Sequence, residues 1–121
     1  MKGLFILAAI VININLSMAQ TALFESESNV ISYMDGKTFY SSENGIEIQY
    51  GYISAYNTYG ITASNKNGGK FYFINVDITA YGSFADLYGM SSEDGTNFGF
   101  RVYQGKIVIG EGEEKATLYL K

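Results

Sequence analysis

The sequence contains no cysteine, histidine, proline or tryptophan among its 121 residues. Without imidazole or thiol groups it cannot build a Ser-His-Asp triad, a cysteine nucleophile, a disulfide framework or an ordinary zinc site. Hydrophobic residues make up 47% of the chain and charged residues 17%, a balance that excludes intrinsic disorder. The composition therefore predicts a compact domain that is not an enzyme and uses no cofactor.

The first nineteen residues have the organisation of an export signal. A basic start precedes nine apolar residues over 4–12, and Ser17–Ala19 fits the small-x-small rule for cleavage. The apolar run is shorter than the roughly 20 residues that a membrane-spanning helix needs. We predict a signal peptide over 1–19, cleavage near Ala19-Gln20, and a secreted or periplasmic protein without a transmembrane segment. A buried N-terminal strand is the alternative.

Clustered positive charge is also missing. Once the signal is removed, seven basic side chains remain against twelve acidic ones, and Arg101 is the single arginine. Nucleic acids are bound mainly through clustered lysine and arginine, so we expect no nucleic-acid partner. The acidic loop formed by Glu111, Glu113 and Glu114 suggests a different partner, a protein with a cationic cleft.

What the chain does contain is a strand-like alternation. Apolar residues occupy every second position over 46–52, and over 70–79 the pattern places Tyr72, Ile74, Val76 and Ile78 on one face. Such a period of two is typical of antiparallel sheets with one buried face. The runs are separated by dipeptides suited to tight hairpins, namely Asp35-Gly36, Asn44-Gly45, Asn67-Gly68, Asp94-Gly95 and Gln104-Gly105.

These signals predict an all-β fold, a single antiparallel barrel or sandwich of about eight to nine short strands joined by Asx-Gly turns. Glycines in or beside the strands indicate strong bending and favour the barrel. Residues 20–28 are expected to form a polar N-terminal arm, and 29–121 a single β domain. The strands are predicted at 29–34, 37–41, 46–54, 58–64, 70–79, 84–89, 96–104 and 106–111, with a ninth at 115–120.

One turn sequence occurs twice. The segment 41–45, Ser-Ser-Glu-Asn-Gly, recurs fifty residues later at 91–95 as Ser-Ser-Glu-Asp-Gly. An ancient duplication would explain the repeat, and so would the use of the same turn chemistry at two hairpins.

Few residues are candidates for chemistry. A glycosidase needs two carboxyl groups facing each other, and Asp77 and Asp86 are the pair that neighbouring strands could bring together. Arg101 could bind a ligand carboxylate, although a lone arginine in a sheet more often pairs with an acidic residue such as Asp77 or Asp86. Calcium ligands at Glu93, Asp94 and Asn97 are explained equally well as a turn, so we predict no metal site.

Tyrosine is the most distinctive feature, with eleven in the chain. Its ring and hydroxyl suit stacking on sugars or filling a pocket on a protein. We predict a binding face formed by Tyr56, Tyr59, Tyr81 and Tyr88, together with Arg101. The alternative for these tyrosines is packing over bare glycine backbone on a neighbouring strand.

The sequence thus predicts an exported, non-enzymatic domain that binds a carbohydrate or a protein through a tyrosine-rich face. Two alternatives stay open. The protein could inhibit or protect an extracytoplasmic hydrolase through its acidic loop. It could also carry a small apolar ligand if the barrel is hollow. The oligomeric state does not follow from the sequence.

Overall fold

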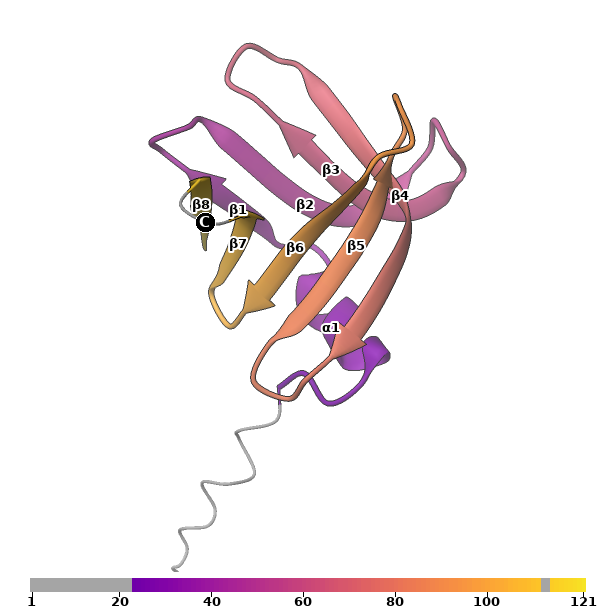
Figure 1. Cartoon of the computed structure of the whole chain (residues 1–121), viewed down its shortest axis with the longest axis vertical. Helices are drawn as coiled ribbons and strands as arrows, with labels where there is room; N and C mark the ends of the chain where they lie inside the picture. The colour runs from indigo at the N-terminus through magenta and orange to yellow at the C-terminus, as the bar shows by residue number, and fades with distance from the viewer. Residues whose placement is uncertain (1–22, 112–113) are drawn as a thin grey trace, which may run out of the picture.

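The fold is a closed eight-stranded antiparallel barrel with one short helix, seen in a computed structural model that describes residues 23–111 and 114–121 (Figure 1). The helix α1 spans Glu27–Met34. The strands are β1 (Thr38–Ser41), β2 (Ile46–Ile53), β3 (Thr58–Ser64), β4 (Lys70–Ala80), β5 (Ala85–Ser91), β6 (Asn97–Tyr103), β7 (Lys106–Glu111) and β8 (Glu114–Leu120). The predicted signal peptide and the centre of the acidic loop lie outside the described residues.

Each strand pairs with the next one along the chain, and β8 returns to pair with β1. The prediction of an antiparallel all-β domain is therefore confirmed, as a barrel rather than a sandwich. The five predicted turn glycines, at 36, 45, 68, 95 and 105, all have positive φ, which is the conformation that tight turns require of them.

The predicted strand over 29–34 is wrong, because this segment is the helix α1. The Ser26 hydroxyl caps the helix by accepting a hydrogen bond from the Asn29 N–H at 3.2 Å. Val30 and Met34, four residues apart, place two fully buried side chains on one face. The helix has eight residues, too few to give a sustained helical pattern, and it is stabilised by packing rather than by propensity.

The described part of the expected polar arm is not a loose segment either. Phe24 is fully buried and pairs with Gly82 in the β4–β5 turn through two backbone hydrogen bonds, of 2.9 and 2.7 Å. Farther along, the Tyr33 hydroxyl accepts a hydrogen bond from the Gly105 N–H in the β6–β7 turn at 2.6 Å. These contacts fasten α1 to one end of the barrel, where Val30 joins the core (Figure 1).

The barrel interior is occupied by side chains from every strand. Eleven of the buried hydrophobic residues have less than 2% of their surface exposed, among them Phe39, Ile48, Leu87, Ile107 and Leu118. Among the described residues, no helix is long and apolar enough to span a bilayer.

A bulge in β4 changes the predicted inner face. Ile74 pairs with Met90 and Asp77 with Tyr88, so two residues of β4 lie opposite the single Gly89. Asn75, one of the two, has φ +53°. Phe73 consequently shares the core face with Val76 and Ile78. The predicted single face of Tyr72, Ile74, Val76 and Ile78 is therefore wrong, because the extra residue reverses the alternation.

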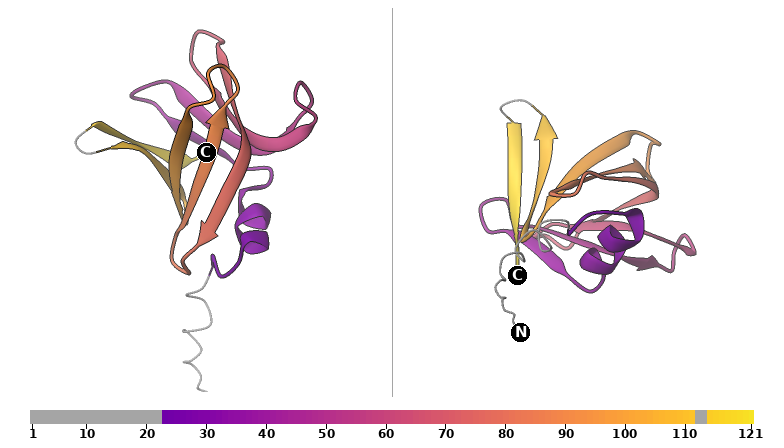
Figure 2. Two further views of the ribbon diagram at one scale, coloured as in Figure 1. Left: turned by 45° about the vertical axis from the view of Figure 1, so that its right-hand side comes forward. Right: turned by 90° about the horizontal axis from the view of Figure 1, so that it is seen from below.

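The β7–β8 hairpin projects from the barrel (Figure 2). Pairing between β6 and β7 stops at Phe100 and Ile109, one residue before Gly110, which has φ +99°. On the other side, β8 pairs with β1 at only two positions, Phe39 with Leu120 and Tyr40 with Tyr119. The hairpin is thus held in the barrel at its base, and its outer half leaves strand edges on both sides without a neighbouring strand.

The two copies of the repeated turn have similar hydrogen bonds. The N–H of Gly45 donates to the carbonyl of Ser41 at 2.7 Å, and that of Gly95 donates to Ser91 at 2.9 Å. The turn chemistry therefore accounts for both copies without a duplication.

Candidate functional site

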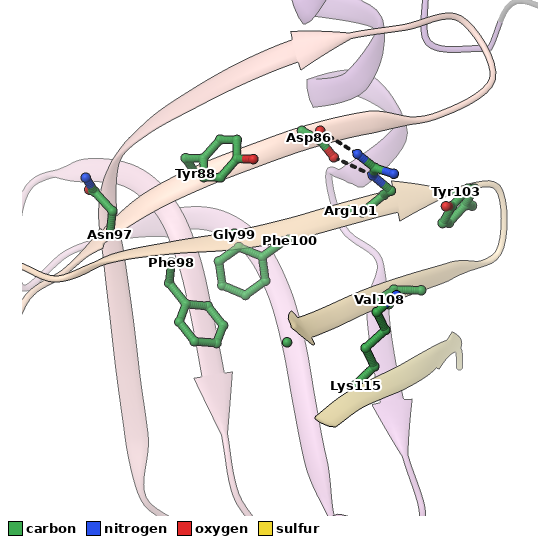
Figure 3. Close-up of a pocket in the computed structure, with 11 residues that line it drawn as sticks. Asp86, Tyr88, Asn97, Phe98, Gly99, Phe100, Arg101, Tyr103, Val108 and Lys115 are labelled. Carbon is green, nitrogen blue, oxygen red and sulfur yellow. Dashed lines mark hydrogen bonds and ion pairs between the residues drawn. The ribbon is translucent and has the colours of Figure 1, made fainter. Parts of the chain in front are cut away.

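A groove of about 400 Å³ runs along β5 and β6 and reaches the projecting β7–β8 hairpin (Figure 3). We call it the β6 groove. Alternation places Ala85 and Leu87 in the core and turns the residues between and after them, Asp86 and Tyr88, outward. The groove is lined by Asp86, Tyr88, Asn97, Phe98, Gly99, Phe100, Arg101, Tyr103, Val108, Gly110 and Lys115.

An ion pair forms the polar centre of the groove. Arg101 lies directly opposite Asp86 in the β5–β6 ladder. Its Nε donates to one carboxylate oxygen at 2.7 Å and its Nη2 to the other at 3.0 Å (Figure 3). This planar arrangement fixes both side chains. The hydrogen-bonded pairing with Asp86 raises the pKa of Arg101 further above its ordinary value, and Tyr103 adds to this effect. The predicted cross-strand partner of Arg101 is thereby confirmed as Asp86.

A chain of aromatic contacts runs from Arg101 toward the β4–β5 turn. The Arg101 Cζ lies 4.5 Å from the centre of the Phe84 ring, a cation–π contact. Phe84 stacks on Tyr81 with ring centres 4.8 Å apart, and its ring lies 5.9 Å from that of Tyr103. The predicted site residue Tyr81 is therefore connected to Arg101 through Phe84.

The ring of Tyr88 lines the groove and packs against the backbone of β6 at Gly99. It lies opposite Gly99 in the ladder, and a β-carbon built on Gly99 would be 3.0 Å from Cε1 of the ring. One face of the ring therefore covers bare backbone, as the glycine-packing alternative predicts. The side chain is nevertheless 52% exposed, so the rest of the ring remains available to a ligand.

The remaining two predicted site residues belong to the β2–β3 hairpin. Tyr59 packs against Tyr52 and Tyr50, with ring centres at 5.4 and 6.3 Å, and Tyr56 packs edge-on to Tyr72 at 5.7 Å. We call Tyr50, Tyr52, Tyr56 and Tyr59 the hairpin tyrosines, whereas Tyr72 lies on β4. Burial raises the pKa of Tyr50 above its ordinary value, and the charge of Glu27 adds to this effect. Of the five predicted site residues, Tyr88 and Arg101 line the β6 groove, and Tyr81 lies next to it through Phe84. Tyr56 and Tyr59 are not among the residues that line it.

Sequence reasoning missed several residues at or beside the groove, among them Tyr103, Phe84 and Lys115. Tyr103 follows Arg101 at the same spacing of two that places Gly99 on this face, so the alternation predicts it. Phe84 could have been inferred from the predicted start of a strand at that position. Lys115 has no comparable signal, because it enters the groove through the bend of the β7–β8 hairpin.

The two carboxylates weighed as a catalytic pair have different surroundings. Both carboxylate oxygens of Asp86 are bonded to Arg101, and Asp77 is exposed on β4 opposite Tyr88. Within 23–111 and 114–121, no group of three or more acidic residues gathers closely enough to hold a metal ion. The groove offers a ligand hydrogen-bonding groups, a charge pair and aromatic rings.

Comparisons with protein-family models, with curated proteins and with solved structures gave no match to this chain.

Proposed function

We propose that the protein is exported and binds a carbohydrate in the β6 groove without transforming it. The observation that carries this proposal is the Tyr88 ring, half exposed and backed by Gly99, beside the Asp86–Arg101 pair. The volume of about 400 Å³ lies within the usual range of small-molecule sites, roughly 300–1,000 Å³.

Sugars match this combination of groups. A pyranose ring has an apolar face of C–H groups, which packs against the flat apolar face of a tyrosine. Its hydroxyls both donate and accept, so a carboxylate and a guanidinium side by side can each engage one of them. The Asp86–Arg101 pair and the backing of Tyr88 fix these groups in advance, which lowers the entropy cost of binding.

Replacing Tyr88 by alanine tests the proposal. The parent protein is first screened against immobilised neutral and acidic oligosaccharides, and the Kd for the best binder is then measured by titration calorimetry. We expect Tyr88→Ala to raise this Kd about tenfold or more, because one stacking surface is lost.

Tyr59→Ala is the matched control, since Tyr59 is 57% exposed and belongs to the hairpin tyrosines. It should leave the Kd unchanged. The proposal fails if the parent protein binds none of the oligosaccharides, or if Tyr59→Ala weakens binding as much as Tyr88→Ala does.

A further inference from the structure

The edge of β8 that faces β1 is largely unpaired. The ladder between these strands ends at Tyr40 and Tyr119, while β8 extends back from there to Glu114. Edges of this kind present free N–H and C=O groups and act as templates for another strand. We call this stretch of β8, from Lys115 to Thr117, the β8 edge.

The hydrogen-bond pattern identifies which groups are free. The Leu120 N–H donates to the Gly105 carbonyl on the β7 side, and the Lys121 N–H donates to the Thr38 carbonyl on the β1 side, both at 2.9 Å. Because these directions alternate along a strand, the N–H and C=O groups of Lys115 and Thr117 point away from β7. Among residues 23–111 and 114–121, no strand pairs with these two residues on that side, so within this part of the chain both donors and both acceptors are open.

The β8 edge is complementary to itself. When two copies lie antiparallel with Ala116 on the twofold axis, Thr117 of each copy falls opposite Lys115 of the other. Both residues of each pair have edge-facing backbone groups, so this register forms four hydrogen bonds. It also avoids placing the two lysines directly opposite each other, which would be unfavourable.

We propose that the protein forms a homodimer by antiparallel pairing of the β8 edges. The two β7–β8 hairpins then form one continuous four-stranded sheet, in the twofold arrangement commonest among oligomers. Beside the edge is a groove of about 380 Å³, lined in part by Tyr40 and Tyr119, which gives the partner's side chains room. Tyr119 is 60% exposed and supplies apolar contact area next to the new pairing.

A disulfide at the twofold axis tests this register. The chain has no cysteine, so Ala116→Cys introduces a single thiol. In the dimer the two Ala116 residues form a non-hydrogen-bonded pair with Cα atoms about 4.5 Å apart, within disulfide range. With oxidised glutathione, this variant should form a covalent dimer on non-reducing gels. Lys70→Cys, exposed on β4, is the control and should stay monomeric on the same gel.

The association itself is measured by sedimentation velocity over a range of concentrations. Thr117→Pro removes the edge-facing N–H and no hydrogen bond to β7, so the fold should be retained, as circular dichroism and thermal unfolding will show. The dimer loses two hydrogen bonds, and we expect its dissociation constant to rise about thirtyfold. Thr117→Val keeps the N–H and should dimerise like the parent.

A parent protein that stays monomeric at every concentration would overturn the proposal. So would a dimer that Ala116→Cys does not cross-link, because its interface would then lie elsewhere. The cross-linking result decides the matter even if Thr117→Pro fails to fold.

Discussion

The orientation of Tyr88 is explained by the glycine that lies opposite it on the neighbouring strand. Tyr88 is fixed because Gly99 leaves room for its ring, and a sequence-based interpretation had to choose between packing and binding for this tyrosine. The structure shows that the two roles are compatible. One part of the ring covers the backbone, and about half of the side chain remains exposed.

A pair of opposed glycines allows a strict test of close packing. Gly60 and Gly51 face each other across β2 and β3, yet their surroundings differ. A β-carbon on Gly60 would overlap the Phe73 carbonyl oxygen, whereas one on Gly51 would have no heavy atom within 4 Å. We expect Gly60→Ala to lower the free energy of unfolding by about 1–3 kcal/mol, measured by urea denaturation.

Gly51→Ala is the control for this change. It should leave the free energy of unfolding unchanged or raise it by about 0.5 kcal/mol, because alanine restricts the unfolded chain. Equal losses in the two variants would contradict the packing explanation.

The helix α1 depends on contacts that are distant in the sequence. Its segment is rich in residues that also favour strands, and the fully buried side chains of Val30 and Met34 stabilise it as a helix. A Ser26 cap and a spacing of four residues are visible in the sequence, but they are weak signals over eight residues. The partners of α1 lie on β2, on β4 and in the β6–β7 turn, and no local pattern reveals them.

Truncating a buried side chain of α1 measures this contribution. Met34→Ala removes a side chain that is 1% exposed, and we expect the free energy of unfolding to fall by about 2–5 kcal/mol. Ser32→Ala, on the exposed side of the same helix, should change it by less than about 0.5 kcal/mol. Urea denaturation followed by circular dichroism gives both values, and similar values for the two variants would mean that α1 does not belong to the core.

The strands were far more predictable than the helix. Alternation and turn glycines predicted all eight strands with ends within two residues of the observed ones, because these signals are local. The β4 bulge was not predicted, since it depends on how Asn75 and Val76 meet Gly89 on the next strand. Of the candidate site, Arg101, Tyr88 and Tyr81 were predicted, whereas Lys115 depends on the bend at Gly110.

At the scale of the whole molecule, the ladder that closes the barrel, between β1 and β8, has the fewest residue pairs. β1 and β8 share two residue pairs, whereas β2 and β3 share seven. Opening of this seam exposes less apolar surface than unfolding of the whole barrel, so it should occur more often. The side chains that occupy the interior, among them Phe39 and Leu118, also mean that the carrier alternative has less support than binding at the β6 groove.

Amide hydrogen exchange measures the opening of this seam. The Lys121 N–H, bonded to Thr38 across the seam, should exchange at least about tenfold faster than the Ile61 N–H in the centre of β3. Equal protection of the two amides would show that the barrel opens as one cooperative unit.

The order of the strands around the barrel is the order in which they are synthesised. A chain that emerges gradually from a ribosome can therefore pair each new strand with the one that has just appeared. The helix is the exception. It is among the first elements to emerge, yet its attachment points at Gly82 and Gly105 follow about fifty and seventy residues later. Throughout that interval the side chains of Phe24 and Met34 lack their final environment, which makes the start of the domain the segment most in need of protection during biogenesis.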